Sequence, residues 1–428
     1  LVIDMSALTT LTRFDGDFEK VDHLRYDLNA LVYELRPEPK SVCIIGAGGG
    51  KDVLTALTAG ARHVTAVEVN PLIVDDVMLG EYREFTGGLY ARPDVSVHVD
   101  DGRAFMERST DEYDVIVVSM VDTSAATAAG AYALTENGLY TVEAFVSFLA
   151  RLAPGGVLVV STASLPDLWV GARLSSVARE ALVRVGQSAE RNVLVASTPW
   201  IGSNDATLRA LLIKPDGFSD AERSRYAASV ERLDFAPTYL GPGSPSAKDA
   251  EDTLMQRVLS STDDASLARV LADQPIDVRP VHDDRPFFFY QNRFGDLMAA
   301  LVSGASSHLF GNGLRVLAKV LALALAALLV CMGLPLLLLR RASATPARAQ
   351  VVDLFYAASL GVGFMYVEIA LVHRVTLYLG QPTYTLVAIL FSLLVWGGVG
   401  SRFFGAALAA RPRRGQRWLI GCALAATS

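Results

Sequence analysis

The sequence has few of the side chains that form disulfide frameworks or local metal sites. Its 428 residues include only three cysteines and six histidines. Cys43 lies in a predicted strand, whereas Cys331 and Cys422 lie in distant apolar runs. No Cys-x-x-Cys or His-x-x-x-His spacing occurs, and these are the spacings that bring metal ligands together locally. We therefore expect neither a disulfide scaffold nor a metal cofactor.

Basic side chains are also scarce in the first three quarters of the chain. Residues 1–310 contain 27 Lys and Arg against 43 Asp and Glu, which gives a net charge of −16. A nucleic-acid-binding protein needs a clustered basic face to neutralise phosphates, and this region has none in its sequence pattern. We expect no nucleic-acid partner, and a small or membrane-borne substrate instead.

The last quarter of the chain lacks acidic residues and is dominated by apolar runs. Residues 311–428 contain 11 basic and two acidic side chains, for a net charge of +9. With 51% hydrophobic residues and a mean hydropathy of +0.33, the whole chain is too apolar for a purely soluble protein. Because the chain begins without Met and stops inside an apolar run, we expect a fragment of a longer multi-pass protein in the lipid bilayer. The predicted transmembrane helices cover about 314–339, 351–372 and 384–409, with a truncated one from 417.

Residues 41–235 alternate between strand patterns rich in Val and Ile and amphipathic helical patterns. This alternation predicts an α/β fold with a doubly wound, mostly parallel sheet of seven strands. The last two strand patterns lie close together and predict a hairpin with an antiparallel final strand, as is typical of class I methyltransferase-like sheets. The predicted strands lie near 41–46, 63–68, 95–99, 113–119, 156–162, 191–197 and 207–213.

The same patterns divide the chain into four segments. The longest is a Rossmann-like domain for an adenosyl cofactor, and a covering segment with a helix near 249–260 follows it. The predicted bounds are 1–40 for a lead-in segment, 41–235 for the Rossmann-like domain, 236–312 for the covering segment and linker, and 313–428 for the transmembrane helices.

A glycine turn between the first two predicted strands indicates a cradle for a nucleotide. Gly46, Gly48 and Gly50 allow the backbone to turn tightly and to approach a ligand closely. Glu68, 22 residues after Gly46, ends the next strand and can accept hydrogen bonds from both ribose hydroxyls. These residues predict an adenosine-containing ligand.

The third predicted strand supplies further ligand-binding candidates, Asp101 and Gly102. A carboxylate at this strand end commonly accepts the adenine amino group. The glycine turn lacks the third glycine of the dinucleotide fingerprint, which favours an S-adenosylmethionine-type ligand. The alternatives to this ligand are a dinucleotide, or no ligand at all, with glycines that serve only the packing of the sheet.

Motifs that resemble those of known proteins lie at 42–50, 64–71, 97–105 and 113–118, and further ones at 139–145, 283–289 and 363–371. The first four segments resemble spermidine synthases, and the other three resemble their membrane-bound relatives, in which a synthase-like domain is joined to transmembrane helices. The resemblance implies a class I fold and either decarboxylated S-adenosylmethionine or S-adenosylmethionine as co-substrate, with aminopropyl transfer to an amine acceptor.

The sequence departs from this family after the fourth predicted strand. Soluble spermidine synthases carry two aspartates there, one of which helps to deprotonate the attacking amine. Here Ser119 occupies the first position, and only Asp122 remains. We predict that Asp122 binds or deprotonates the nucleophile and that Ser119 contacts the cofactor, because ligands gather at the carboxyl ends of such strands. A helix N-cap is the alternative role for Asp122.

The departure leaves other functions open. Methyl transfer from S-adenosylmethionine does not need both aspartates. A ligand-sensing domain without turnover, attached to a transporter-like helix bundle, is favoured by Ser119 and by Glu368, an ionisable residue inside a predicted span. An NAD oxidoreductase is weakened by the missing third glycine.

The arginine distribution and the expected cofactor predict opposite sides of the membrane for the nucleotide domain. Arginines at 340–348 and 411–417 place the loops after the first and third runs in the cytoplasm. A full span at 314–339 would then put the nucleotide domain outside, where adenosyl cofactors are scarce. A re-entrant first run, a misleading charge rule or a domain without cofactor function would each remove the conflict. We expect a cytoplasmic nucleotide domain on an inner or plasma membrane.

Overall fold

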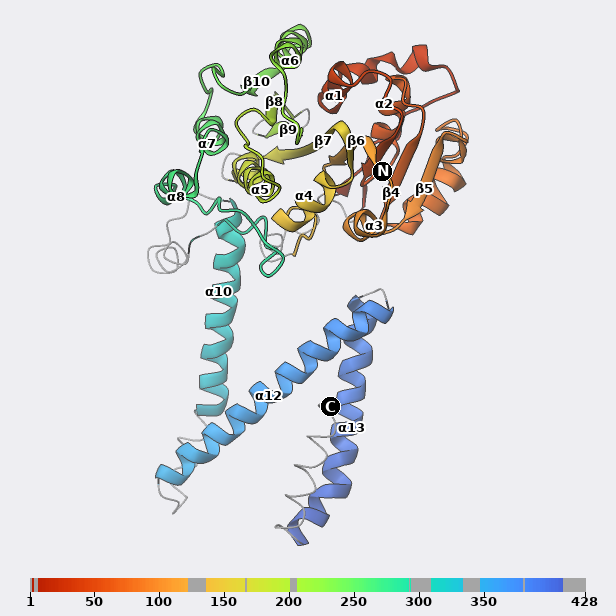
Figure 1. Cartoon of the computed structure of the whole chain (residues 1–428). Coiled ribbons are helices and arrows are strands. Elements are labelled where there is room, and N and C mark those ends of the chain that lie inside the picture. The colour runs from red at the N-terminus through yellow and green to blue at the C-terminus, as the bar shows by residue number, and fades with distance from the viewer. Residues whose placement is uncertain are drawn as a thin grey trace. The chain divides into compact units, whose positions relative to one another are not determined.

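The computed structural model describes residues 2–3, 7–121, 136–165, 168–200, 206–291, 293, 309–333, 347–379 and 382–410. The chain divides into two compact units, which we call unit 1 (Leu1–Leu325) and unit 2 (Ala326–Ser428). Figure 1 shows the elements of both units.

Unit 1 is built on an eight-stranded sheet with the order β10-β8-β9-β7-β6-β3-β4-β5 (Figure 1). The five strands from β7 to β5 in this order are parallel, whereas β9 is antiparallel to both β7 and β8. The strands are β3 (Val42–Ile45), β4 (Val64–Glu68), β5 (Val95–Val99), β6 (Tyr113–Ser119), β7 (Leu152–Ser164), β8 (Val193–Pro199), β9 (Thr207–Ile213) and β10 (Ala236–Tyr239). A separate pair joins β1 (Val2–Ile3) and β2 (Ala7–Leu8).

All seven predicted strands are present, and the predicted hairpin is the antiparallel pair β8–β9. The predicted count of seven is wrong, because the start of the segment expected to cover the domain forms β10. This strand is only four residues long and contains Pro237, so its strand pattern is weak. It pairs with β8 at the edge of the sheet, which is where a strand can accommodate a residue that lacks an N–H group.

Helices cover both faces of the sheet and form two hydrophobic cores. Alternate residues of β3 point to opposite faces, so that Cys43 and Ile45 belong to the core under α3, α4 and α5, and Val42 and Ile44 belong to the core under α1, α2 and α6. The helices are α1 (Leu31–Leu35), α2 (Lys51–Thr58), α3 (Gly102–Arg108), α4 (Val142–Leu149), α5 (Val170–Arg184), α6 (Asp220–Arg232), α7 (Ala250–Leu259) and α8 (Asp264–Ala272). Shorter or irregular helical segments are η1 (Phe18–Tyr26), η2 (Leu28–Ala30), η3 (Ile73–Glu81) and η4 (Leu89–Ala91).

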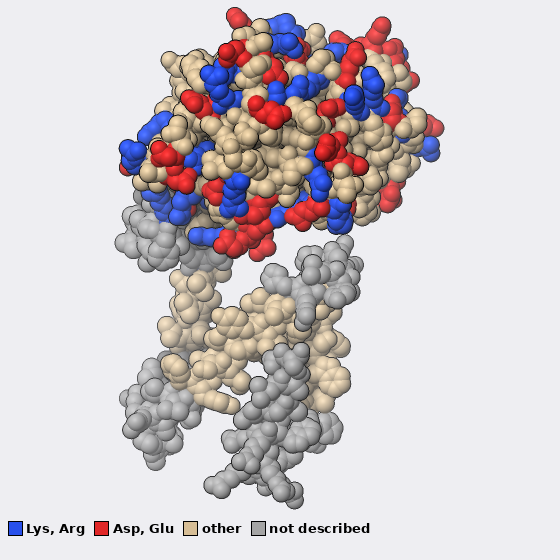
Figure 2. All heavy atoms as spheres, viewed as in Figure 1, with Lys and Arg blue, Asp and Glu red and all other residues tan. Residues whose placement is uncertain are grey.

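The apolar runs of the C-terminal part are helical wherever they are described: α10 (Leu309–Leu328), η7 (Leu329–Gly333), α12 (Ala347–Leu379) and α13 (Pro382–Ala410). One stretch, Phe355–Val372 of α12, is long and apolar enough by length and composition to cross a membrane. Lys319–Cys331 and Thr385–Gly400 are shorter apolar helices. Of the three predicted spans that fall largely in the described part of the chain, one contains a candidate of this kind; the predicted span from 417 lies outside the described residues. On the face shown in Figure 2, acidic and basic side chains are interspersed over unit 1.

Candidate functional site

The strand order creates a topological switch point at β3. The chain passes from β3 to β4 on one side, whereas β6 lies on the other side of β3. Such a switch point is where ligands bind in open α/β sheets, because the loops after the two strands diverge there. The loop after β3 contains Gly46, Gly48 and Gly50, and the loop after β6 begins at Met120.

The loop after β3 requires glycine at three positions. Gly46, Gly48 and Gly50 have φ values of +76°, +50° and +82°, in the left-handed region that side chains disfavour. A Cβ atom added to Gly46 would lie 2.5 Å from Val121 Cγ1. The loop therefore packs directly against the chain that leaves β6, and residues 47–50 are buried.

Glu68, at the end of β4, lies under this loop. Its side chain is buried, with Oε2 accepting a hydrogen bond from the Gly48 N–H (2.8 Å) and Oε1 from the Asn70 N–H (2.9 Å). Each carboxylate oxygen has a second lone pair, with which it can accept a ligand hydroxyl. The predicted ribose-binding residue thus also holds the glycine loop in place.

Two side chains that the sequence pattern does not predict also hold the loop. Thr9 Oγ1 accepts a hydrogen bond from the Gly49 N–H (2.7 Å), and the Tyr90 hydroxyl donates to the Gly48 carbonyl (2.7 Å). Burial raises the pKa of Tyr90, so its hydroxyl remains a donor. Residues 9–11 therefore lie directly against the glycine loop, with Leu11 bridging to Gly50. The lead-in segment is part of the site.

Asp101 and Gly102 lie where β5 leads into α3. Asp101 is the N-cap of α3, and its Oδ1 accepts a hydrogen bond from the Ala104 N–H (2.8 Å). A Cβ atom on Gly102 would lie 2.3 Å from Ile45 Cγ2, so only glycine fits against the end of β3. Capping occupies one oxygen of Asp101, and its contact with adenine stays a prediction.

The loop after β6 begins with strained backbone. Ser119 ends the strand, and Met120 has a φ of +43°, an uncommon conformation for a residue with a side chain. Ser119 Oγ accepts a hydrogen bond from Asn29 Nδ2 (2.9 Å), and the Ser161 hydroxyl lies 3.4 Å away. Asp122 lies outside the described residues, so its catalytic role stays a prediction.

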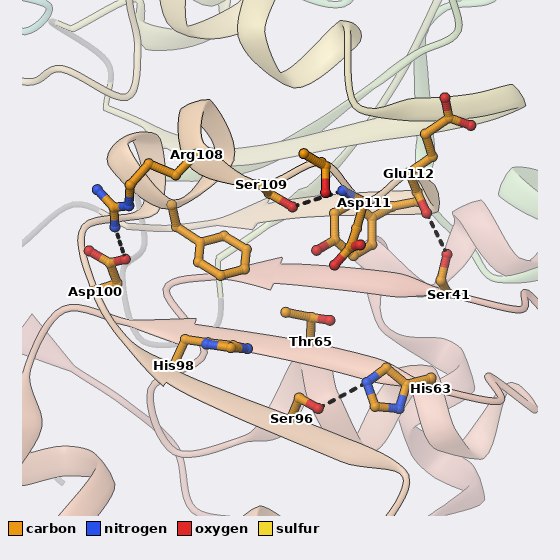
Figure 3. A pocket seen from close by; sticks show the side chains of 13 residues that line it. Ser41, His63, Thr65, Ser96, His98, Asp100, Arg108, Ser109, Asp111 and Glu112 are labelled. Carbon is orange, nitrogen blue, oxygen red and sulfur yellow. Dashed lines mark hydrogen bonds and ion pairs between the residues drawn. The ribbon is translucent and has the colours of Figure 1, made fainter.

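A separate polar groove of about 680 Å³ lies along the same face of the sheet as α3 (Figure 3). Thr65, Ser96 and His98 line it from β4 and β5, and the loop between α3 and β6 lines its other side. Ser96 Oγ contacts His63 Nε2 at 3.1 Å, and Asp100 forms an ion pair with Arg108. None of the predicted ligand-binding residues lines this groove. In the described part of the chain, no group of three or more His, Cys, Asp or Glu side chains is placed to hold a metal ion.

Comparisons with known proteins agree with the resemblance seen in the motifs. The sequence profile of the spermine/spermidine synthase domain matches residues 24–204, a range that contains the glycine loop, Glu68, Asp101 and Ser119. Polyamine aminopropyltransferase 2 of Pseudomonas aeruginosa is 31% identical over 128 residues, which are 29% of this chain and 33% of the relative. Polyamine aminopropyltransferase 2 of Hyperthermus butylicus is 29% identical over 148 residues, which are 34% of this chain and 45% of the relative.

The similarity is thus confined to part of each protein. The chain spans less than half the length of these two curated relatives. Among solved structures, spermidine synthase from Thermotoga maritima aligns over 57% of this chain and 72% of its own, with 16% identity and a TM-score of 0.37. The similarity to the spermine/spermidine synthase domain covers residues 24–204, and one described helix is a candidate for the membrane-bound part of the resemblance.

Proposed function

We propose that unit 1 is a transferase that moves an aminopropyl group from decarboxylated S-adenosylmethionine to an amine. The observation that carries this proposal is the glycine loop with Glu68 beneath it, located at the switch point of the sheet and inside the region that matches spermine/spermidine synthases. The loop lies at the edge of the sheet where nucleotides bind in such folds, and the buried carboxylate offers acceptors for ribose hydroxyls.

In this reaction the lone pair of a neutral amine attacks the methylene carbon beside the sulfonium. The carbon–sulfur bond breaks, its electron pair stays on sulfur, and methylthioadenosine leaves. The new carbon–nitrogen bond places a positive charge on nitrogen until a proton is lost. We assign acceptance of that proton to Asp122, which follows β6 by three residues.

Methyl transfer is the second candidate, and Ser119 is the observation that favours it. This hydroxyl occupies the strand end where soluble spermidine synthases carry a carboxylate, so the site has one negative charge fewer beside Asp122. With S-adenosylmethionine as donor, the same displacement at the methyl carbon would release S-adenosylhomocysteine.

We also propose that the chain is anchored in a bilayer, with unit 1 in the cytoplasm. The Phe355–Val372 stretch of α12 has 18 residues, which is about 27 Å of helix and close to the thickness of a hydrocarbon core. Large apolar side chains of unit 2 are exposed, among them Phe355 (75%), Leu394 (73%) and Trp396 (71%), and lipid would cover them. Protease digestion of sealed inside-out and right-side-out vesicles tests the orientation, and cleavage of unit 1 only in right-side-out vesicles would contradict it.

Calorimetric binding to the full chain in detergent tests the proposed reaction class. We expect methylthioadenosine and decarboxylated S-adenosylmethionine to bind, and S-adenosylmethionine to bind more weakly. A preference for S-adenosylmethionine would support methyl transfer in place of aminopropyl transfer. Binding of NAD alone, or of none of these ligands to the folded chain, would overturn the proposal.

A further inference from the structure

Three polar side chains from distant parts of the sequence meet beside the end of β6. Asn29, in η2, uses its amide nitrogen to donate hydrogen bonds to Asp52 Oδ1 (3.1 Å) and to Ser119 Oγ (2.9 Å). Asp52 lies in the first turn of α2, directly after the glycine loop. Asn29 and Asp52 are only 6% and 9% exposed. We call these three residues the Asn29 cluster.

The amide oxygen of Asn29 is buried and has no hydrogen-bond partner in the described part of the chain. The orientation of this amide follows from its neighbour, because a flipped amide would bring its oxygen against the acceptor-only carboxylate of Asp52. A buried oxygen without a donor is unfavourable. Its position next to Ser119, at the ligand-binding edge of the sheet, therefore indicates that a ligand supplies the missing N–H or O–H group.

The charge of the cluster selects the kind of ligand. Asp52 is a buried carboxylate that forms no ion pair within the described residues, because the neighbouring Lys51 pairs with Asp27 instead (2.8 Å). Burial, followed by the nearby negative charge of Asp52, raises the pKa of Tyr33. Although burial lowers it, the charges of Asp52 and Asp27 raise the pKa of Lys51, so this ammonium offsets part of the charge of Asp52 without a direct ion pair. A buried carboxylate beside an unpartnered amide oxygen is complementary to a cation that carries N–H donors.

We propose that the Asn29 cluster is the subsite that receives an amino group of the acceptor. Asn29 Oδ1 accepts an N–H from this group, and Asp52 supplies the compensating negative charge from α2. The cluster thereby replaces, from a different element, the carboxylate that Ser119 lacks at the end of β6. This inference rests on the proposed transferase function and extends it, because the subsite favours amines over uncharged nucleophiles of similar size.

The test is the binding of diaminobutane, with butanediol as its uncharged counterpart, to the full chain saturated with methylthioadenosine. Asp52→Asn removes the charge while keeping the size of the side chain, and we expect it to weaken diaminobutane binding about tenfold or more. Asn29→Asp adds a second carboxylate, and we expect it to strengthen diaminobutane binding. Asp76→Asn, which removes an exposed carboxylate from the first turn of η3, is the matched control and is expected to change neither affinity.

The outcomes separate the inference from the function on which it rests. Unchanged methylthioadenosine binding together with opposite effects of Asp52→Asn and Asn29→Asp on diaminobutane supports the subsite. Equal diaminobutane affinity in wild type and Asp52→Asn, or equal affinity for diaminobutane and butanediol, overturns it while leaving the nucleotide site intact. Failure of the wild-type chain to bind methylthioadenosine overturns the proposed function itself. If Asp52→Asn does not fold, Asn29→Asp alone decides, because a purely structural role predicts no gain in diamine affinity.

Discussion

Glu251 is predicted to make the stability of unit 1 fall as the pH rises from about 4.5 to about 7. Its carboxylate is 5% exposed and shares the buried Arg209 guanidinium with Asp249 and Asp252, at nitrogen–oxygen distances of 2.9, 3.2 and 3.1 Å. Burial raises the pKa of Glu251 from 4.5 to about 7, although Arg209 opposes the shift. The folded chain therefore binds a proton in this pH range that the unfolded chain has already lost.

The magnitude follows from the two pKa values. The difference between 4.5 and about 7, at about 1.4 kcal/mol for each tenfold change in proton affinity, amounts to about 3 kcal/mol. Because the pKa of Glu251 is higher in the folded chain than in the unfolded chain, this contribution to the free energy of unfolding is lost as the pH rises from about 4.5 to about 7 and is regained on acidification. Glu251→Gln cannot titrate, so the free energy of unfolding of wild type minus that of the variant should fall by about 3 kcal/mol between pH 4.5 and pH 8.

Pulse proteolysis of the full chain in detergent, across a urea series at several pH values, measures this difference by following the cleavage of unit 1. Glu84→Gln, at an exposed position, is the matched control and should leave the pH dependence unchanged. A wild-type-minus-variant difference that stays constant or rises with pH would refute the reasoning. It would mean that attraction to Arg209 outweighs the cost of burying the carboxylate.

Three further predictions concern the glycine loop and a second ion pair. Gly46→Ala should abolish measurable methylthioadenosine binding in calorimetry, because the position has a φ of +76° and the new Cβ would lie 2.5 Å from Val121 Cγ1; retained affinity would show that the loop tolerates a side chain. Thr9→Val should lower the free energy of unfolding by about 1 kcal/mol and weaken methylthioadenosine binding, since it leaves a glycine-loop N–H without its acceptor; weaker binding with unchanged stability would contradict this coupling. Although burial opposes the shift, hydrogen bonds from Lys214 and the Ser219 cap lower the pKa of Glu222 to about 2. The wild-type chain should therefore lose stability as the pH falls from 4.5 towards 2. Acid unfolding curves should show a smaller loss over this range for Lys214→Gln.

The parts of the fold that the sequence predicts are those with strong local signals. The apolar strand runs predict seven strands because buried parallel strands are continuously hydrophobic. The glycine loop is recognisable because Gly46, Gly48 and Gly50 sit between two such runs. β10 has a weak signal, since its four residues include a proline and obtain their partner, β8, from a different part of the chain.

The parts of the site that the sequence does not predict depend on tertiary contacts. Asn29 is 90 residues from Ser119 and lies in a short helical turn with no motif of its own. Thr9 reaches the glycine loop from a segment 40 residues upstream. Hydropathy predicts four spans, and within the described residues one stretch, Phe355–Val372, is long and apolar enough by length and composition to cross a membrane.

A turnover measurement on the full chain in detergent tests whether the protein transfers an aminopropyl group. Decarboxylated S-adenosylmethionine and diaminobutane are incubated with the protein, and methylthioadenosine is measured by chromatography. We expect amine-dependent formation of methylthioadenosine, which Asp122→Asn reduces strongly while the affinity for methylthioadenosine is retained. No methylthioadenosine above the protein-free control, from a chain that binds methylthioadenosine, would contradict the assignment of aminopropyl transfer.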